Sequence, residues 1–248
     1  MVSKKLSLKL GWFYPDLMNT YGDYGNVVVL QNRAAWVGVK LEVVKVDIHN
    51  NQIGDRDIDL IFMGGAQDRQ QSIVSSDLIN NKRPLINELL DRQVPGLFIC
   101  GAYQLMGNYY VTAEGTKIEG LKIFDLYTEQ PAANSQRLIG NITLQSTLFP
   151  QTSIVGFENH GGRTYLGSQS QPLGTVIVGH GNNGEDKKEG VVYKNAIGSY
   201  LHGPILPINP IITDWLISKA IETKYTEKLP LAFPGDDFEK MIRESISG

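Results

Sequence analysis

The stretch over residues 96–107 limits the possible folds of this chain more than any other. An apolar run at 97–99 ends at Cys100, the only cysteine, and two small residues and a helix-like pattern follow directly. A strand, a sharp turn with a nucleophile at its apex and a helix together form a nucleophile elbow. The start of such a helix stabilises a thiolate through its dipole and its free N–H groups. Two interpretations stay open: Cys100 is a catalytic nucleophile, or it is a buried thiol that fills space.

Strand-like and helix-like patterns alternate along the first part of the chain. Apolar–polar alternation indicates half-buried strands, and apolar residues three or four positions apart indicate helices. Strands separated by helical lengths predict a parallel sheet built from βαβ units. The patterns predict strands at 6–14, 39–46, 58–62 and 97–99, a helix at 27–37 with Asn26 as its N-cap, and a helical region up to about Arg92 that is broken near Pro84.

Residues 118–200 have a different texture, because short strand-like runs alternate there with clusters of Gly and Asn. Such runs are typical of an antiparallel section, and we expect it to be appended to the parallel sheet. The strand-like runs are 121–127, 138–144, 154–157, 175–178 and 190–193.

The C-terminal part of the chain is predicted to be helical. A helix is expected at 211–221, and a short amphipathic helix at 236–246 follows a Pro-Gly break. We therefore predict an α/β fold with a mostly parallel central sheet, helices on both faces and an appended antiparallel section. This domain is expected over residues 1–225, and a C-terminal extension with the short helix over 226–248.

Composition excludes several classes of function. A net charge of -3 over 248 residues gives no electrostatic basis for binding nucleic acid or an anionic membrane surface. A single cysteine cannot form an internal disulfide, which fits a reducing compartment. The N-terminus lacks the apolar region of a signal peptide, and no run approaches the roughly 18 apolar residues that span a bilayer. We predict a soluble, cytoplasmic protein without membrane insertion.

Three chemically capable segments lie where predicted strands end. Gly64 and Gly65 follow the strand at 58–62, and small residues there let backbone N–H groups approach a ligand. A glycine-rich turn that only needs positive φ is the simpler alternative. Cys100 ends the next strand, and His202 ends a later strand-like run. Ligands bind at the carboxyl ends of strands in open α/β sheets, so we expect these segments to converge on one site.

The four histidines differ in their surroundings. His202 is the candidate general base because it ends a strand, although a structural imidazole is the alternative. His160 and His180 lie in loops of small residues and either could face the site, whereas His49 lies in a polar loop. None has the paired spacing with Cys or acidic residues that a zinc site shows, so no metal is predicted.

Together these motifs resemble a known family. The Gly64–Gly65 pair, the Cys100 elbow with Gln104 four residues on, and the run Tyr-Leu-His-Gly-Pro at 200–204 are similar to class I, triad-type glutamine amidotransferases of the cobyric acid synthase-like branch. The resemblance implies a flavodoxin-like domain. A narrower resemblance, to the glutaminase subunits of lipid II isoglutaminyl synthases, is carried by segments 14–23, 156–160, 181–186 and 198–204.

The resemblance implies a glutaminase mechanism. The Cys100 thiolate would attack the side-chain amide of L-glutamine, and His202 would accept the thiol proton and pass one to the leaving ammonia. Backbone N–H groups of Gly65 and Gly101 would hold the oxyanion, and each donor contributes roughly 3–4 kcal/mol in comparable sites. Water would then release glutamate from the thioester.

Two residues are implied to bind the substrate. The family pattern places an arginine for glutamine at Arg137, and a guanidinium can bind both oxygens of an α-carboxylate. From the residues alone, a solvated charge at a strand edge is the favoured explanation of Arg137. Gln104, in the helix after the nucleophile, is the second expected contact with substrate.

Two positions depart from the pattern of the class. Ala102 stands where most members have Gly, which affects only the tightness of the turn. Pro204 stands where the usual triad has Glu, so no carboxylate in this motif can orient His202. The resemblance implies that an aspartate of a partner subunit plays that part and that the isolated chain hydrolyses glutamine slowly.

The amidation half of such a reaction needs ATP, and the chain has no Gly-x-x-x-x-Gly-Lys-Ser/Thr phosphate loop. No cofactor is therefore expected in this chain. The resemblance implies that ATP and Mg belong to a Mur-ligase-like synthetase partner (MurT), which would form a heterodimer with this chain and amidate the D-glutamate of the lipid II stem peptide in peptidoglycan synthesis. That lipid-linked substrate would bring the complex to the inner membrane face.

Several alternatives stay open. The C-terminal helix at 236–246 either docks on the partner or packs on its own domain, and the second is the default. The chain could instead be a glutaminase that serves a corrinoid-type synthetase. It could also be an amidotransferase-shaped regulatory subunit without catalysis.

Overall fold

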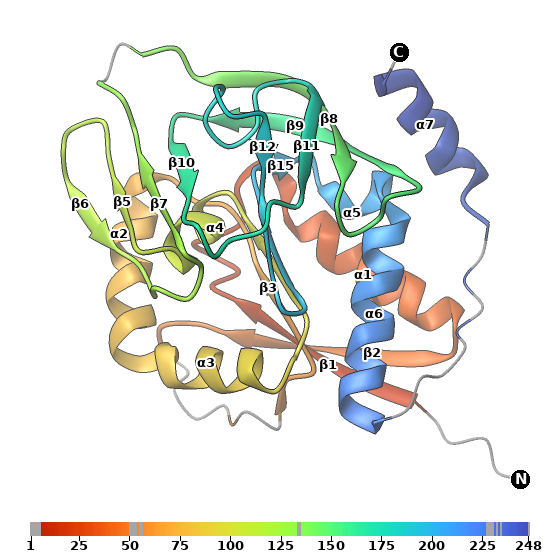
Figure 1. The fold of residues 1–248 in the computed structure, drawn as a ribbon. Coiled ribbons are helices and arrows are strands. Elements are labelled where there is room, and N and C mark those ends of the chain that lie inside the picture. The colour runs from red at the N-terminus through yellow and green to blue at the C-terminus, as the bar shows by residue number, and fades with distance from the viewer. Residues whose placement is uncertain are drawn as a thin grey trace, which may run out of the picture.

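The computed structural model describes residues 6–49, 54, 57–132, 135–226, 231, 233 and 235–247. Pro234, in the predicted break before the last helix, lies outside these residues. A six-stranded sheet forms the centre of the molecule, and two smaller sheets lie above it in the view of Figure 1.

The central sheet contains the strands that the alternating patterns predict. Its order is β13-β14-β4-β3-β1-β2, and all neighbours run parallel except β13 and β14. Parallel neighbours need crossover connections, which the helices supply. The strands are β1 (Leu6–Phe13), β2 (Val39–Val46), β3 (Leu60–Met63), β4 (Gly96–Ile99), β13 (Val191–Tyr193) and β14 (Ala196–Ser199).

Alternation along the strands sends side chains into two hydrophobic cores. In β4, Leu97 and Ile99 join one core and Phe98 joins the other. Burying such a side chain contributes roughly 1.5–3 kcal/mol, so each face of the sheet is stabilised by a cover of helices. The prediction of helices on both faces is confirmed. The first core holds α1 (Tyr24–Trp36) and α6 (Pro210–Tyr225), and the second holds α2 (Asp68–Asp77), α3 (Arg83–Asp91) and α4 (Gly101–Met106).

The start of α1 differs from the prediction. Asp23, not Asn26, stands at the N-cap position, and its side chain makes no capping bond. The Asn26 side chain instead accepts the N–H of Leu206 at 3.0 Å, so a tertiary contact uses the group that the sequence pattern assigns to the cap. Between α2 and α3, Leu78–Lys82 form a π-helical turn (η3), and Pro84 lies in the first turn of α3, which confirms the predicted break.

The region after the elbow forms the antiparallel section that its texture predicts. One sheet has the order β10-β7-β5-β6 and the other β12-β11-β8-β9-β15. The predicted strand at 121–127 is largely wrong, because N–H groups of 121–124 bond to carbonyls at the end of α4 and at Gly107. The strands are β5 (Tyr109–Val111), β6 (Lys117–Glu119), β7 (Leu126–Glu129), β8 (Leu138–Ser146), β9 (Ser153–His160), β10 (Arg163–Leu166), β11 (Gly174–Val178), β12 (Lys188–Glu189) and β15 (Leu201–His202).

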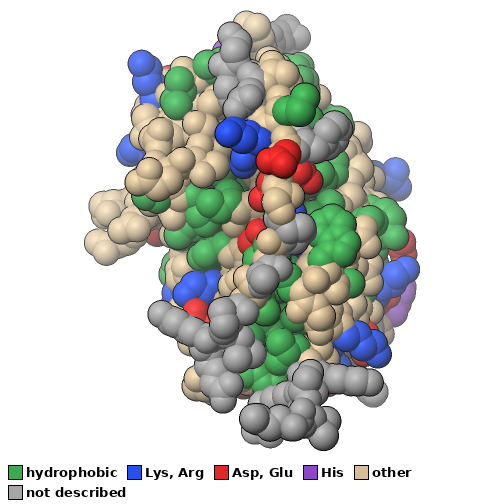
Figure 2. Space-filling model, turned by 90° about the vertical axis from the view of Figure 1, so that its right-hand side faces the viewer, with side chains coloured by type: hydrophobic (Ala, Val, Ile, Leu, Met, Phe, Trp, Pro, Cys, Tyr) green, Lys and Arg blue, Asp and Glu red, His purple; other side chains and the backbone are tan. Residues whose placement is uncertain are grey.

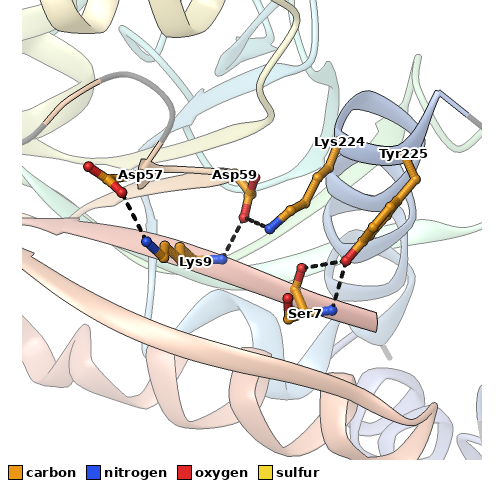
Figure 3. Close-up of polar contacts among 6 residues, drawn as sticks. All are labelled: Ser7, Lys9, Asp57, Asp59, Lys224 and Tyr225. Atoms are coloured by element: carbon orange, nitrogen blue, oxygen red, sulfur yellow. Dashed lines mark hydrogen bonds and ion pairs between the residues drawn. The ribbon is translucent and has the colours of Figure 1, made fainter. Parts of the chain in front are cut away.

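The end of α6 is tied to the start of β1 (Figure 3). The hydroxyl of Tyr225 donates to the carbonyl of Ser7 at 3.1 Å and accepts its N–H at 3.0 Å. Lys224 pairs with Asp59 at 2.9 Å, and the same carboxylate accepts the N–H of Lys9 at 2.8 Å. These contacts join the end of α6 to strand β1 and to the residue that precedes β3.

The last helix, α7 (Asp237–Ser247), confirms the predicted amphipathic helix and packs on its own domain. It contacts the short helix α5 (Ile205–Ile208) and strands β8 and β9. Just before it, Asp236 accepts a hydrogen bond from the buried Arg33 of α1 at 2.9 Å. On the face that lies to the right in Figure 1, hydrophobic side chains are interspersed with acidic and basic ones (Figure 2). None of the helices in the described ranges is long and apolar enough to cross a membrane.

Candidate active site

The carboxyl ends of the central strands bring the predicted site residues together. The loops after neighbouring strands β4, β3 and β1 contain Cys100, Gly65 and the segment 14–23, and β14, on the other side of β4, leads to His202. A Cβ placed on Gly65 would lie 3.2 Å from Cε1 of His202, 3.3 Å from Oδ2 of Asp23 and 3.3 Å from Cβ of Cys100. The three side chains therefore meet around one glycine.

Cys100 occupies the apex of a strained turn. Its backbone has φ 51° and ψ -105°, a conformation that residues with a side chain rarely adopt. Its N–H donates to the carbonyl of Ser199 at 2.8 Å, and its carbonyl accepts the N–H of Gln104 at 3.0 Å, so both sides of the turn are held. The half-buried thiol lines a cavity. The nucleophile elbow that residues 96–107 predict is present.

His202 is enclosed by the fold. Only 2% of its side chain is exposed, and the ring of Tyr21 packs edge-on against it at a centroid distance of 4.9 Å. The bend that leads to it is held by Glu189, which accepts the hydroxyl of Ser199 at 2.8 Å and the N–H of Tyr200 at 2.7 Å. Neither ring nitrogen of His202 has a hydrogen-bond partner within the described part of the chain.

Asp23 is a site residue that the sequence patterns did not single out. Its fully buried carboxylate accepts the N–H of Gly65 through Oδ2 at 2.6 Å. Oδ1 lies 3.9 Å from Nδ1 of His202 and has no hydrogen-bond partner among the described residues. One signal was available: Asp23 lies in the loop after the first strand, whose carboxyl end shares an edge of the sheet with Cys100.

The surroundings of His202 favour its charged form. Burial opposes protonation, but the nearby Cys100 and Asp23 outweigh it and raise the pKa of His202 to about 10. An imidazolium next to a cysteine stabilises the thiolate, which is the reactive form of the nucleophile.

The two expected oxyanion donors differ in their availability. The N–H of Gly65 is taken by Asp23, so in this structure it is not free to bind an oxyanion. Gly101 follows the nucleophile at the start of α4, and a Cβ on it would lie only 2.9 Å from the backbone nitrogen of Ala66. Ala66 lines the cavity, and its N–H bonds to no acceptor in the described ranges. Of these two backbone N–H groups at the end of β3, that of Ala66 is therefore the one without an acceptor among the described residues.

Cys100 opens into a cavity of about 490 Å³ that also contains both expected substrate contacts. Arg137 is exposed at its rim, and its guanidinium donates to Oδ1 and to the carbonyl of Asn159 at 3.1 and 2.9 Å. Gln104 is buried in the wall, where its amide donates to the hydroxyl of Tyr200 at 2.9 Å and accepts from Gln71 at 3.0 Å. The cavity is lined by Thr20, Tyr21, Ala66, Gln67, Asp68, Arg69, Gln71, Cys100, Gln104, Tyr110, Gln130, Arg137, Asn159, His160, Gly161 and Gly162.

Two further residues of the cavity, His160 and Asp68, add polar groups to its lining. His160 stacks on Tyr200 with ring centroids 3.6 Å apart, and its Nδ1 donates to the carbonyl of Gly162 at 2.8 Å. Burial lowers the pKa of His160 to about 3, so Nε2 is an uncharged acceptor. Asp68 places a carboxylate in the same cavity as Arg137.

His180 is exposed, and no cluster of three or more His, Cys, Asp or Glu among the described residues could hold a metal ion.

Comparison with known proteins agrees with this geometry. Residues 9–210 match the model of the CobB/CobQ-like glutamine amidotransferase domain. Among solved structures, that of PurLQS from Thermotoga maritima superposes with a TM-score of 0.58 at 14% identity over 90% of this chain and 100% of that one. The glutaminase domain of Trypanosoma brucei CTPS superposes with a TM-score of 0.54 at 10% identity over 93% and 98%. At such low identities these neighbours show the fold alone.

The fold, the elbow and the matched domain define the class: the chain belongs to the CobB/CobQ-like glutamine amidotransferase family. Within it, the chain is 47% identical to the lipid II isoglutaminyl synthase (glutamine-hydrolyzing) subunit GatD of Staphylococcus aureus N315, over 86% of this chain and 84% of that protein. It is 41% identical to the subunit of the same name from Streptococcus pneumoniae R6, over 97% and 90%. The resemblance stated from the motifs is confirmed.

Proposed function

We propose that this chain is the glutaminase subunit of a lipid II isoglutaminyl synthase in peptidoglycan synthesis. The observation that carries the proposal is the meeting of Cys100, on its strained elbow, with His202 beside a polar cavity. Two relatives that share most of the chain's length bear the corresponding name. A glutaminase that serves a corrinoid-type synthetase is the weaker alternative, because no feature of the described residues favours it.

The chemistry follows from the positions of the side chains. The Cys100 thiolate attacks the amide carbon of glutamine, and the negative charge that develops on oxygen is held by the N–H groups of Gly101 and Ala66. His202 then donates its proton to the leaving nitrogen, and ammonia departs from a thioester. Water, deprotonated by the same imidazole, attacks the thioester and releases glutamate.

The cavity suits the zwitterionic end of glutamine. Arg137 can bind the α-carboxylate with nitrogen donors, and Asp68 offers a carboxylate for the α-ammonium group. Nε2 of His160 adds a neutral acceptor in the same wall. Gln104 mainly holds the wall of the cavity in place, because its side-chain amide is already hydrogen-bonded to Tyr200 and Gln71.

The ammonia is proposed to serve a synthetase partner of the Mur-ligase type (MurT), bound as a heterodimer. That partner would hold ATP and Mg and amidate the D-glutamate of the lipid II stem peptide. Because the final substrate is lipid-linked, we place the reaction at the cytoplasmic face of the membrane. The two relatives support an assembly, since both are named as subunits.

Replacing Cys100 by Ala tests the function directly. We expect the Cys100→Ala complex to release no ammonia from glutamine, because Cys100 is the only thiol in the chain. The same complex should still amidate lipid II when ammonium salt is supplied, which shows that the partner is intact. Ammonia release by the variant at the wild-type rate would rule out the mechanism.

A further inference from the structure

Three tyrosines form a row across the outer face of the sheet β10-β7-β5-β6, and we call them the tyrosine row. Tyr165 of β10 lies directly opposite Tyr127 of β7, and the pairing of β5 with β7 places Tyr109 in the same row. The rings are stacked, with centroids 5.3 Å apart between Tyr165 and Tyr127 and 5.4 Å apart between Tyr127 and Tyr109. All three are only half-buried, whereas the neighbouring Thr128 and Thr164 are buried against the other face. The row is therefore a partly exposed aromatic surface.

One end of the tyrosine row already binds a cation of the chain itself. The ammonium group of Lys117, on the edge strand β6, lies 4.5 Å from the centroid of the Tyr109 ring. The negative face of an aromatic ring attracts a cation placed over it. Lys117 also pairs with Glu119 at 3.2 Å, so its charge is compensated within the chain.

The other end of the row lacks such a cation. Tyr165 lies on β10, the opposite edge strand of the sheet, and no cation from the described residues lies over its ring. Arg163, on the same strand, instead donates to the carbonyls of Gly161 and Gln136 at 2.8 and 2.6 Å. The Tyr165 end is therefore where a cation from another molecule can complete the row.

Two carboxylates beside the row have no counter-ion. Glu129, at the end of β7, and Glu185, in the loop before β12, are exposed and form no ion pair with a described residue. Glu129 accepts the hydroxyl of Tyr109 at 3.4 Å, and Lys187, two positions after Glu185, is not paired with it. Burial raises the pKa of Tyr165, and Glu185 and Glu129 raise it further, because both carboxylates lie near this ring.

We propose that the tyrosine row and these two carboxylates form a docking surface for a basic segment of the synthetase subunit. A lysine or arginine of that segment would bind against Tyr165 and pair with Glu185. The arrangement would repeat the one that Lys117 makes with Tyr109 and Glu119. The charge of the surface selects a cationic segment, because both carboxylates would repel an acidic one. This inference rests on the proposed glutaminase function, which requires a synthetase.

The docking surface and the active-site cavity belong to one sheet. Tyr110, which follows Tyr109 and faces the other way, lines the cavity and is hydrogen-bonded to Gln130 and Asp68 at 2.6 and 3.0 Å. The glycine pair at 161–162, directly before β10, lines the cavity as well. A subunit bound on the outer face of this sheet therefore lies close to the place where ammonia is made.

Stacked cross-strand aromatic pairs also stabilise a sheet, so the first variant changes the carboxylates and leaves the tyrosines in place. The double variant Glu129→Gln with Glu185→Gln removes both charges and keeps the size of the side chains. Glu42→Gln with Glu88→Gln is the matched control, because these exposed carboxylates of β2 and α3 give the same change of net charge away from the row. Thermal unfolding of both double variants shows whether the fold is kept.

Binding of the purified Mur-ligase-type synthetase to the full chain, without glutamine, measures the effect. Loss of two exposed charge pairs should raise the dissociation constant roughly 3–30-fold in Glu129→Gln with Glu185→Gln, and the control should stay near the wild-type value. Raising NaCl from about 50 to about 300 mM should weaken wild-type binding more than binding of this variant. Tyr165→Ala should also weaken binding, whereas Tyr165→Phe, which keeps the aromatic face, should bind like the wild type.

An affinity and a salt dependence that do not change in Glu129→Gln with Glu185→Gln would overturn the proposal. An equal loss in the control would overturn it too, because the effect would then come from net charge alone, and so would a wild-type chain that does not bind the synthetase. The proposed function is tested separately. A complex that forms through this surface but releases no ammonia from glutamine refutes the glutaminase and leaves the docking surface in place.

Discussion

Arg137 shows how a single exposed residue can be prepared for binding. Its Nε and Nη2 donate to Asn159, which holds the planar guanidinium at the cavity rim, and Nη1 is bound by no described residue. A side chain that is already ordered loses less entropy when it binds a ligand. From the residues alone a solvated charge explained Arg137 better, and its place in the lining of the cavity now supports a role in binding.

Replacing Arg137 by Lys should weaken glutamine binding. Lysine keeps the charge but loses the fork that binds two oxygens, so we expect KM to rise roughly 10-fold or more with a smaller change in kcat. Steady-state ammonia release measures both constants. 4-Aminobutanamide, which lacks the α-carboxylate, is the control substrate and should be hydrolysed equally slowly by both proteins. A larger loss on this analogue than on glutamine would contradict the assignment.

At the scale of elements, the bend between β14 and β15 depends on one buried carboxyl group. Glu189, in β12, is fully buried and accepts hydrogen bonds from Ser199 and Tyr200, the residues that form the bend. Burial raises the pKa of Glu189 to about 7, against the opposing effect of those hydrogen bonds. The protonation of Glu189, which holds the bend before His202, is therefore sensitive to pH.

The free energy of unfolding should fall as the carboxyl group of Glu189 ionises. The folded state keeps the Glu189 proton up to a pH of about 7, whereas the unfolded chain loses it near the ordinary value of 4.5. The protonated carboxyl group of Glu189 makes its full contribution to the free energy of unfolding below pH 4.5. This contribution is lost as the pH rises through 7, a change on the order of 3 kcal/mol.

Urea unfolding between pH 4.5 and 8 checks this prediction. The Glu189→Gln variant should lack that part of the pH dependence, because glutamine keeps the acceptor oxygen and cannot ionise. Glu185→Gln, at an exposed position four residues earlier, should follow the wild-type curve. Parallel curves for wild type and Glu189→Gln would show that Glu189 is already ionised in the folded protein at low pH.

At the scale of the whole molecule, residues from the central sheet and from both smaller sheets line the cavity. The central sheet supplies Cys100, and the antiparallel section supplies His160 at the end of β9 and the glycine loop that follows it. The C-terminal helix α7 packs against that section and not beside Cys100.

The isolated chain should hydrolyse glutamine slowly and the complex faster. In the structure of the chain alone, Asp23 and His202 are 3.9 Å apart, too far for a hydrogen bond. We expect kcat for ammonia release to rise at least 10-fold when the synthetase is added, because no carboxylate among the described residues of the chain alone is within hydrogen-bond distance of His202. Titrating the partner into a glutaminase assay measures this. Full activity of the chain alone would contradict the prediction.

Much of the fold was predictable from local patterns. The strand, turn and helix around Cys100 depend on residues close together in sequence, so the elbow could be read from residues 96–107. The parallel sheet followed from alternation and spacing in the same way. The N-cap of α1 was wrong because Asn26 makes a bond to Leu206, which lies far away in the chain.

The sequence by itself determined the strand, turn and helix around Cys100, the α/β class and the family, because all three depend on short motifs whose spacing is local. Only the tertiary structure decided which side chains and backbone N–H groups lie next to Cys100 and which of them are already hydrogen-bonded. Asp23 and His202 lie near opposite ends of the chain, and their proximity depends on how β1, β3 and β14 line up at one edge of the sheet. The same alignment occupies the N–H of Gly65 and leaves that of Ala66 without an acceptor among the described residues. Such contacts arise from the order of strands in the sheet, which no single stretch of sequence contains.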